Sequence, residues 1–403
     1  MIWTLKKVYY RTVQAIVRVG TKHVKFKTPK VIYGAGSVNK LSDIMKEQHI
    51  DKALIIVSKT IMKSGLLETF LEKLKENNIG YELYDNVKPN PTIENIEDCL
   101  KVYKDSGCKA IAVIGGGSPI DCGKVVAARA ANSNLQVKDL RGLLKVRKPI
   151  APLFAVPTTA GSGSEVTVAA VVTDANTHEK YAIADFKLVP DFAILDPELT
   201  VGVPSHLTAS TGMDALTHAI EAYIGKNGTS YTDDKALKAI KLIIENLENV
   251  YKDGTNLDGR NAMLVASNYA GEAFTRAYVG YVHAIAHSIG GLYGVAHGLA
   301  NAIILPKVLE YYGESAYAKL SEIAIYLNLG KANETKKDLA MKVITKIKDM
   351  NANMNIPLGI KELKKEDIHL ISQRATKEGN PGYPVPKIIN IKECEELLES
   401  LVI

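Results

Sequence analysis

The sequence predicts a two-part chain, in which an α/β region is followed by an all-α region. Up to about Pro204, short apolar runs alternate with polar, helix-forming stretches, which is typical of parallel strands joined by helices. After Pro204, long segments rich in Ala, Leu and Lys have apolar residues at a helical spacing, and no strand-like run separates them. With 403 residues, 46% of them hydrophobic, the chain can build a core in each part.

The strands and helices of the first part are expected in a regular order. A buried strand at 52–58 (KALIIVS) precedes a helix that reaches about Asn77, and the run GYELYD then leads to a helix at 92–106. The remaining apolar runs that predict strands lie at 109–117, 150–157, 168–173 and 192–195. We therefore expect three segments: an arm at 1–28, an α/β domain at 29–204 and a helical domain at 205–403.

The arm at 1–28 is strongly basic, because no acidic residue occurs among the first thirty. Its apolar residues are interleaved with the lysines and arginines, which predicts an amphipathic helix. Such a helix either touches an anionic membrane surface weakly or packs on the domain. No apolar run there approaches the roughly 20 residues that span a bilayer. The basic residues are Lys6, Lys7, Arg11, Arg18, Lys22, Lys25, Lys27 and Lys30, and the apolar ones include Trp3, Leu5, Val8, Tyr9, Val13, Ile16 and Val17.

The four cysteines lack the spacing of a metal-binding or redox motif. Cys99, Cys108, Cys122 and Cys394 lie in otherwise ordinary segments, which favours buried, reduced thiols over a disulfide framework. We therefore expect a cytoplasmic protein.

Two histidine-containing segments of the second part predict a metal site. In TGMDALTHAIEAY, Asp214 and His218 are four residues apart, so one turn of helix presents both on the same face. In VHAIAHSIGGLYGVAHGLANA, His283 and His287 repeat that spacing, and His297 follows after glycines that let the chain turn. A single such pair is more often structural, but candidates in two clusters favour a site. One carboxylate with several imidazoles suits Fe(II) or Zn(II).

Two turns of the first part have the composition of a phosphate-binding site. In AVIGGGSPIDCGKVV, three glycines and a serine follow a buried strand and precede a helix that is expected to begin near Pro119, so that backbone N–H groups can face a pyrophosphate. The second turn, PTTAGSGSEVT, supplies hydroxyl groups from Thr158, Thr159 and Ser162 that can hydrogen-bond a ribose, a phosphate or the nicotinamide amide. Lys180 offers a cation and Asn90 a turn amide. Each of these signals has a plain structural interpretation as a tight turn, a cap or a surface residue.

Taken in order, these motifs resemble those of the iron-containing, or group III, alcohol dehydrogenases. The resemblance covers nearly everything from about Pro29 to the C-terminus. The motifs that carry it are VIYGAGS, PNPT, GGGSPID, PTTAGSGSEVT, DPELT, TGMDALTHAIEAY, VHAIAH and HGLANAIILP.

The resemblance implies a Rossmann-like N-terminal domain that binds NAD or NADP and a helical domain that binds the metal, an architecture shared with dehydroquinate synthase-like proteins. Asp214, His218, His283 and His297 match the metal ligands, and His287 matches a histidine that handles the substrate and its proton. The matches to cofactor contacts are Asn90, Gly116, Gly117, Ser118, Thr158, Thr159, Ser162 and Lys180, while Asp121 matches the residue that orients the glycine loop or faces the substrate. Homo-oligomers, dimers or larger, are also implied.

Three departures from the family pattern stand out. Many NAD-preferring members have an aspartate after the first buried strand, where this chain has Ser58 followed by Lys59, so that a 2′-phosphate is not repelled. Ser288 replaces a proline after the second histidine of VHAIAH, and the basic arm is longer than in most members.

We therefore expect a metal-dependent NAD(P)-linked dehydrogenase that acts reversibly on a small primary alcohol or diol, with no nucleic acid as a partner. One alternative is a zinc-dependent, glycerol-dehydrogenase-like polyol oxidoreductase. Another is a dehydroquinate-synthase-like lyase, but the predicted ligand helices have few of the cations that its phosphorylated substrate requires. A non-catalytic scaffold that keeps the fold is the third, against which the intact ligand set argues.

Overall fold

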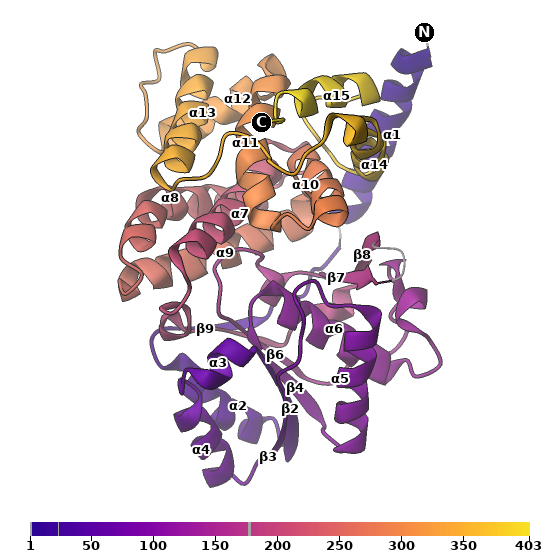
Figure 1. The fold of residues 1–403 in the computed structure, drawn as a ribbon, viewed down its shortest axis with the longest axis vertical. Helices are drawn as coiled ribbons and strands as arrows, with labels where there is room; N and C mark the ends of the chain where they lie inside the picture. The colour runs from indigo at the N-terminus through magenta and orange to yellow at the C-terminus, as the bar shows by residue number, and fades with distance from the viewer. Residues whose placement is uncertain (1, 23, 176–178) are drawn as a thin grey trace. The chain divides into compact units, whose positions relative to one another are not determined.

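A six-stranded parallel sheet forms the centre of the α/β region in the computed structural model, which describes residues 2–22, 24–175 and 179–403 (Figure 1). The strand order is β1-β9-β6-β4-β2-β3, and every neighbouring pair is parallel. The strands are β1 (Lys30–Tyr33), β2 (Lys52–Val57), β3 (Gly80–Tyr84), β4 (Ala110–Gly115), β6 (Leu153–Pro157) and β9 (Phe192–Leu195). The predicted parallel architecture is confirmed.

The central strands are apolar on both faces because helices cover each face. Leu54 and Ile56 of β2 pack with α5 (Ile93–Asp105) and α6 (Gly117–Ala131) in one hydrophobic cluster. Ile55 and Val57, which point the other way, pack with α2 (Leu41–Glu47) and α4 (Glu68–Glu76) in a second cluster. This two-sided burial explains why the strands appear in the sequence as continuous apolar runs.

The structure differs from the sequence-based expectation at three places in this region. The run at 168–173 belongs to β7 (Ala169–Asp174), which pairs antiparallel with β8 (Glu179–Ala184) in a separate sheet completed by β5 (Gly142–Leu143). The single helix expected before Asn77 is divided into α3 (Lys59–Lys63) and α4, and Gly65 between them has a φ of 73°. Helix α6 begins at Gly117, two residues before Pro119, so its first turn includes the glycine loop.

The second part is mostly helical, as predicted, with one isolated β-bridge between Ile360 and Val402. Helices α7 (Ser205–Ile224), α10 (Tyr281–Tyr293), α11 (His297–Tyr312) and α14 (Ile368–Gly379) carry the predicted metal and catalytic residues and the neighbours discussed below. The other helices of this part are α8 (Ser230–Lys252), α9 (Leu257–Ala277), α12 (Glu314–Tyr326), α13 (Lys336–Asn353) and α15 (Ile391–Glu399).

The chain forms two compact units, and one of them includes the N-terminal helix. The helical unit contains residues 1–25, 205–252 and 272–403, and the α/β unit contains residues 26–204 and 253–271. Most of the arm expected at 1–28 is helix α1 (Ile2–Lys22), while Met1 and His23 lie outside the described residues. Across the described residues, no helix combines the length and apolar character needed to cross a membrane.

Candidate functional site

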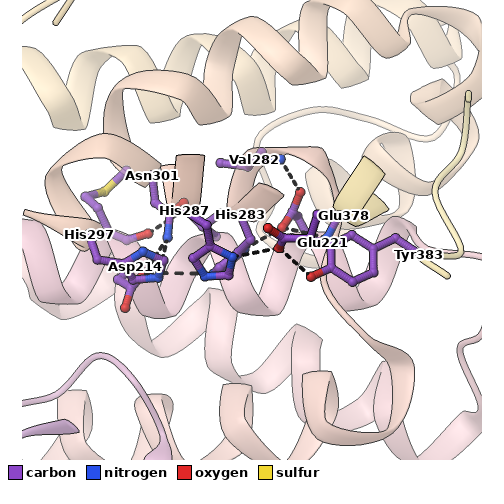
Figure 2. A network of polar contacts seen from close by, with 12 residues as sticks. Asp214, Glu221, Val282, His283, His287, His297, Asn301, Glu378 and Tyr383 are labelled. Carbon is purple, nitrogen blue, oxygen red and sulfur yellow. Dashed lines mark hydrogen bonds and ion pairs between the residues drawn. The ribbon is translucent and has the colours of Figure 1, made fainter. Parts of the chain in front are cut away.

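The four predicted metal ligands meet in the helical unit. Asp214 and His218 lie one turn apart on α7, His283 lies on α10, and His297 is the first residue of α11. One potential ligand atom from each of the four residues lies within 4.8 Å of those of the other three, and Figure 2 shows Asp214, His283 and His297 turned toward one another. Oδ1 of Asp214 is 3.4 Å from Nε2 of His297 and 3.9 Å from Nε2 of His283. Residues 83 positions apart in sequence thus form a single cluster.

A glycine allows α11 to come close enough to α7 for this cluster to form. A Cβ atom at Gly298 would lie 2.3 Å from the backbone oxygen of Ser210, closer than any side chain can approach. The same Cβ would lie 3.2 Å from Cβ of Asp214. The glycine that follows His297 is therefore required for close contact between backbones, which brings this histidine to the carboxylate.

The electrostatics of the cluster suit a divalent cation. Burial lowers the pKa of His218 to about 3 and that of His283 to about 4, so both imidazoles are neutral at pH 7 and have a lone pair for a metal. Burial alone would raise the pKa of Asp214, but the neighbouring histidines lower it overall, so the carboxylate is ionised. Nδ1 of His218 and Nε2 of His283 are buried without a hydrogen-bond partner among the described residues. The residues present therefore fit the implied metal.

Glu221, which the sequence analysis did not select, orients His283. Its Oε2 lies 2.6 Å from Nδ1 of His283 and accepts a hydrogen bond from the backbone N–H of Gly280 at 2.9 Å, while its Oε1 accepts one from Val282 at 2.9 Å. With Nδ1 bonded to the carboxylate, Nε2 of His283 is directed at Asp214. A carboxylate behind a ligand histidine is a common device of metal sites. Its position one turn after His218, on the same helix face, was the available signal.

Asn301, also not predicted, fixes the carboxylate. Its Nδ2 donates a hydrogen bond to Oδ1 of Asp214 at 2.6 Å and lies 3.1 Å from Nε2 of His297. Asn301 is fully buried and lies one turn after His297 on α11. Phe274 stacks on His218, with ring centroids 4.1 Å apart, and so covers that ligand from a further helix.

His287, the predicted catalytic residue, lies beside the metal ligands. Its ring stacks on His297, with centroids 5.1 Å apart, and meets His283 edge-on at 6.0 Å. The side chains of His287 and His297 are 32% and 37% exposed, whereas those of His283 and Asp214 are 2% and 7% exposed. His287 and His297 therefore form the accessible side of the cluster.

The predicted cofactor residues meet in the α/β unit, where the two glycine-containing turns pack against each other. A Cβ at Gly116 would lie 3.1 Å from Oγ1 of Thr159, and one at Gly117 would lie 2.9 Å from Oγ of Ser162. Gly116 is the N-cap of α6, and because it has no side chain it leaves the N–H groups of the first turn uncovered. Thr158 follows β6 directly and bonds through its N–H to the backbone oxygen of Gly115 at 3.0 Å. This glycine-lined helix N-terminus is a suitable place for a pyrophosphate.

Three further predicted residues join in a chain next to this loop. Oγ of Ser118 accepts a hydrogen bond from the N–H of Asn90 at 3.1 Å, and Nζ of Lys180 donates to Oδ1 of Asn90 at 3.0 Å. Ser58 lies at the same edge of the sheet, where its N–H donates to the backbone oxygen of Ile114 at 3.3 Å and its hydroxyl caps α3. Within the described part of the α/β unit, Ser58 forms hydrogen bonds with Ile114, Ile61 and Met62 and with none of the other candidates.

Asp121 supports the second turn. Its Oδ1 accepts a hydrogen bond from Oγ of Ser164 at 2.6 Å and its Oδ2 accepts one from the N–H of Val171 at 2.9 Å. Both carboxylate oxygens are therefore engaged within the protein. Lys124, one turn later on α6, is fully buried and donates to Thr167 and Ala169, which extends the same support. The resemblance implied that Asp121 orients the glycine loop or faces the substrate, whereas the hydrogen bonds of its carboxylate go to Ser164 of the second turn and to Val171 of β7.

Comparison with known protein families matches nearly the whole chain. The model for iron-containing alcohol dehydrogenase matches residues 28–197, and the model for the C-terminal part of the Fe-containing alcohol dehydrogenase family matches residues 208–402. Helix α1 lies outside both matched ranges.

Individual relatives agree with this assignment. A 1,3-propanediol dehydrogenase of Citrobacter freundii is 37% identical over 372 residues, which are 91% of this chain and 96% of the relative. A lactaldehyde reductase of Escherichia coli (strain K12) is 33% identical over 356 residues, 87% of this chain and 93% of that protein. The crystal structure of a 1,3-propanediol oxidoreductase superposes with a TM-score of 0.89 at 35% identity, covering 94% of this chain and all of that one.

Proposed function

This chain belongs to the iron-containing alcohol dehydrogenase family and is an NAD-linked alcohol dehydrogenase, and we propose that its substrate is a small primary alcohol or diol. The proposal is supported by the relatives named for 1,3-propanediol and lactaldehyde, both of them short oxygenated chains. The reaction is reversible, so the corresponding aldehyde is the partner in the opposite direction. The lyase alternative is not favoured.

The observation that carries this proposal is the convergence of Asp214, His218, His283 and His297 within 4.8 Å, with neutral imidazoles and an ionised carboxylate. We propose that these four residues hold Fe(II), with Zn(II) as the alternative that the same donors accept. When bound, the metal supplies Lewis acidity toward the substrate oxygen. Asn301 and Glu221 keep Asp214 and His283 in position, and His287 is proposed to exchange a proton with the substrate hydroxyl.

The residues around the glycine loop are proposed to bind the nicotinamide cofactor. Gly116, Gly117 and Ser118 would bind its pyrophosphate at the N-terminus of α6, and Thr158, Thr159, Ser162, Asn90 and Lys180 would complete the contacts. Because Ser58 and Lys59 stand where a carboxylate would repel a 2′-phosphate, we propose that the enzyme accepts NADP as well as NAD.

The test is anaerobic turnover of metal-free protein reconstituted separately with Fe(II) and Zn(II). The absorbance of NADH and NADPH would be followed with a panel of short aldehydes, alcohols and diols. Metal-dependent turnover with short alcohols or diols is expected, and a reconstituted His218→Ala variant should lose it. No absorbance change with either metal, despite tight nicotinamide binding, would contradict the proposal. Full turnover of His218→Ala would contradict the ligand set.

We propose further that the protein is a cytoplasmic homo-oligomer. The four cysteines are free and buried, which suits a reducing compartment, and the family resemblance supports a dimer or larger assembly. Light scattering coupled to size-exclusion chromatography measures the assembly directly, and a mass near the 43.8 kDa of one chain would contradict it.

A weak contact of helix α1 with anionic membrane surfaces is a secondary proposal. One stripe of α1 consists of Leu5, Val8, Tyr9, Ile16 and Val19, each at least 59% exposed, and the helix contains no acidic residue. Such a helix can bury its apolar stripe among anionic headgroups. Sedimentation with phosphatidylserine vesicles, but not with phosphatidylcholine vesicles, is expected, and Ile16→Asp should abolish it. Equal recovery in the supernatant with both lipids would contradict this contact.

A further inference from the structure

A second carboxylate lies behind His287. Glu378, near the C-terminal end of α14, has Oε1 2.7 Å from Nδ1 of His287 on α10. The hydroxyl of Tyr383 donates a hydrogen bond to the same oxygen at 2.8 Å. Figure 2 shows the three side chains in sequence, with His287 between Glu378 and the metal-ligand cluster. No sequence motif points to Glu378 or Tyr383.

We propose that Glu378 and Tyr383 are positioning residues that fix the ring orientation and the tautomer of His287. An ionised carboxylate can only accept hydrogen bonds, so Nδ1 of His287 must be the nitrogen that carries the proton. In the neutral ring, Nε2 then has the lone pair that can accept a proton from a substrate hydroxyl. This inference rests on the proposed function, because it assigns His287 the proton transfer.

The local electrostatics agree with this arrangement. Partial burial alone would raise the pKa of Glu378, but the charge of His287 and the hydrogen bonds from His287 and Tyr383 lower it overall. Burial raises the pKa of Tyr383 well above its usual value, so its hydroxyl keeps its proton and remains a donor. Both partners therefore have the protonation states that the geometry requires at neutral pH.

Helix α1 holds the segment that carries Tyr383. The side-chain amide of Gln14 donates to the backbone oxygen of Tyr383 at 2.7 Å, and the guanidinium of Arg11 donates to the backbone oxygens of Val385 and Pro386 at 2.7 and 2.8 Å. The N–H of Tyr383 bonds to the backbone oxygen of Gly379 at 2.8 Å, which ties it to the end of α14. A helix outside the family matches thus supports the residues behind His287.

With this positioning, His287 exchanges one proton with the substrate in each direction of the reaction. In alcohol oxidation, the O–H proton would pass to Nε2 of His287, and the nicotinamide, when bound, would supply the acceptor for the hydride of the broken C–H bond. The ring then carries protons on both nitrogens, and Glu378 stabilises the resulting positive charge. In aldehyde reduction the proton returns from Nε2 to the new hydroxyl oxygen. Glu378 stays ionised and Tyr383 keeps its hydroxyl proton throughout, so neither is a catalytic residue.

The first test is kinetic and uses Glu378→Gln, Glu378→Ala and Tyr383→Phe in the metal-loaded enzyme. We expect kcat to fall about 10- to 100-fold for Glu378→Ala, a part of the 10²- to 10⁴-fold that a general acid–base contributes, with a smaller fall for Tyr383→Phe. In a His287→Ala background, the same substitutions should cause no further loss. Equal losses in both backgrounds would overturn the inference.

The second test reads the tautomer without activity. In Zn(II)-loaded protein with ¹⁵N-labelled histidine, the long-range proton–nitrogen spectrum distinguishes Nδ1–H from Nε2–H. We expect Nδ1–H at His287 in the wild type and a shift toward Nε2–H in Glu378→Ala. An unchanged His287 tautomer would overturn the inference. Full turnover of His287→Ala would instead overturn the proton-transfer role, while the tautomer spectrum would still decide whether Glu378 sets the ring.

The chain offers a matched control. His369 and Glu395 form the same kind of pair, with Nδ1 of the histidine 2.6 Å from the carboxylate oxygen. This histidine is 64% exposed and belongs to a surface pair. Glu395→Ala should change the spectrum of His369 and leave both kcat and the spectrum of His287 unchanged. A comparable loss of kcat in Glu395→Ala would show that the effect of Glu378 is not specific.

Discussion

Replacing Glu221 by Gln should weaken both metal binding and the fold, by comparable free energies. The carboxylate accepts three hydrogen bonds, two from the backbone N–H groups of Gly280 and Val282 and one from Nδ1 of His283. A glutamine has one acceptor oxygen, which can keep at most the two donors now shared by Oε2. One buried N–H is then left facing an amide NH₂, which costs about 1–3 kcal/mol of folding free energy.

The expected effect on the metal follows from the role of His283. Loss of a carboxylate partner behind a ligand histidine typically lowers metal affinity about 10- to 100-fold, which corresponds to about 1.4–2.7 kcal/mol. The affinity for Zn(II) would be measured by competition with a chromophoric chelator, and the stability of the metal-free protein by urea unfolding.

Glu165→Gln is the matched control for this substitution. Glu165 is also a buried carboxylate, but it lies in the α/β unit, where it accepts a hydrogen bond from Asn268 at 3.1 Å. We expect this variant to lose stability while its Zn(II) affinity stays at the wild-type value. If Glu221→Gln bound Zn(II) as tightly as the wild type, the orienting role of Glu221 would be refuted.

Three further predictions concern the close helix contact, the cofactor and pH. Gly298→Ala should lower Zn(II) affinity at least about tenfold and destabilise the fold by about 1–3 kcal/mol, because its Cβ would lie 2.3 Å from the backbone oxygen of Ser210. Gly202→Ala is the control, because the Cβ added there meets no atom within 4 Å. Equal Zn(II) affinity and equal stability of the two variants would contradict this reasoning. Ser58→Asp should reduce kcat/KM with NADPH about tenfold or more relative to kcat/KM with NADH, because the carboxylate repels the 2′-phosphate. An unchanged ratio of these two kcat/KM values in steady-state assays would argue that residue 58 does not face the adenosine ribose. Burial lowers the pKa of Lys124 to about 8 from 10.5, so between these pH values the unfolded chain holds a proton that the folded chain has lost, and stability should rise with pH across that window. Lys124→Met should remove this contribution from the difference in urea midpoints between pH 8 and 10. If the urea midpoint changed with pH equally in both proteins, this would count against the lowered pKa of Lys124.

The candidate metal site was the part of the function most accessible from sequence. Asp214 and His218 are four residues apart on one helix, so their shared face follows from helix geometry alone. The relation of this pair to His283 and His297 came from the family resemblance, because no local rule places three helices around one point. The structure supplies that reason in Gly298, whose lack of a side chain lets α11 approach α7.

The residues that orient His283 and His287 could not be predicted from local spacing in the same way. Glu221 has a weak local signal, since it follows His218 by three positions, but Glu378 and Tyr383 lie about ninety positions beyond His287 and have no motif of their own. Their role depends on the packing of α14 against α10, which is a long-range property. Similarly, the sequence pattern could not show that β7 lies outside the main sheet, because a short apolar run looks the same for a strand of either sheet.

The parallel α/β region, the helical region, the two glycine turns and the residue types of the metal site could be predicted from the sequence. These features follow from local periodicity, turn chemistry and ligand chemistry, which act over a few residues. Which distant side chains touch is visible only in the folded chain: Asp121 supports a loop, Glu221 orients His283, and α1 holds the segment of Tyr383. The physical reason is that such contacts are set by helix packing, where close approach and burial over long sequence separations select the partners.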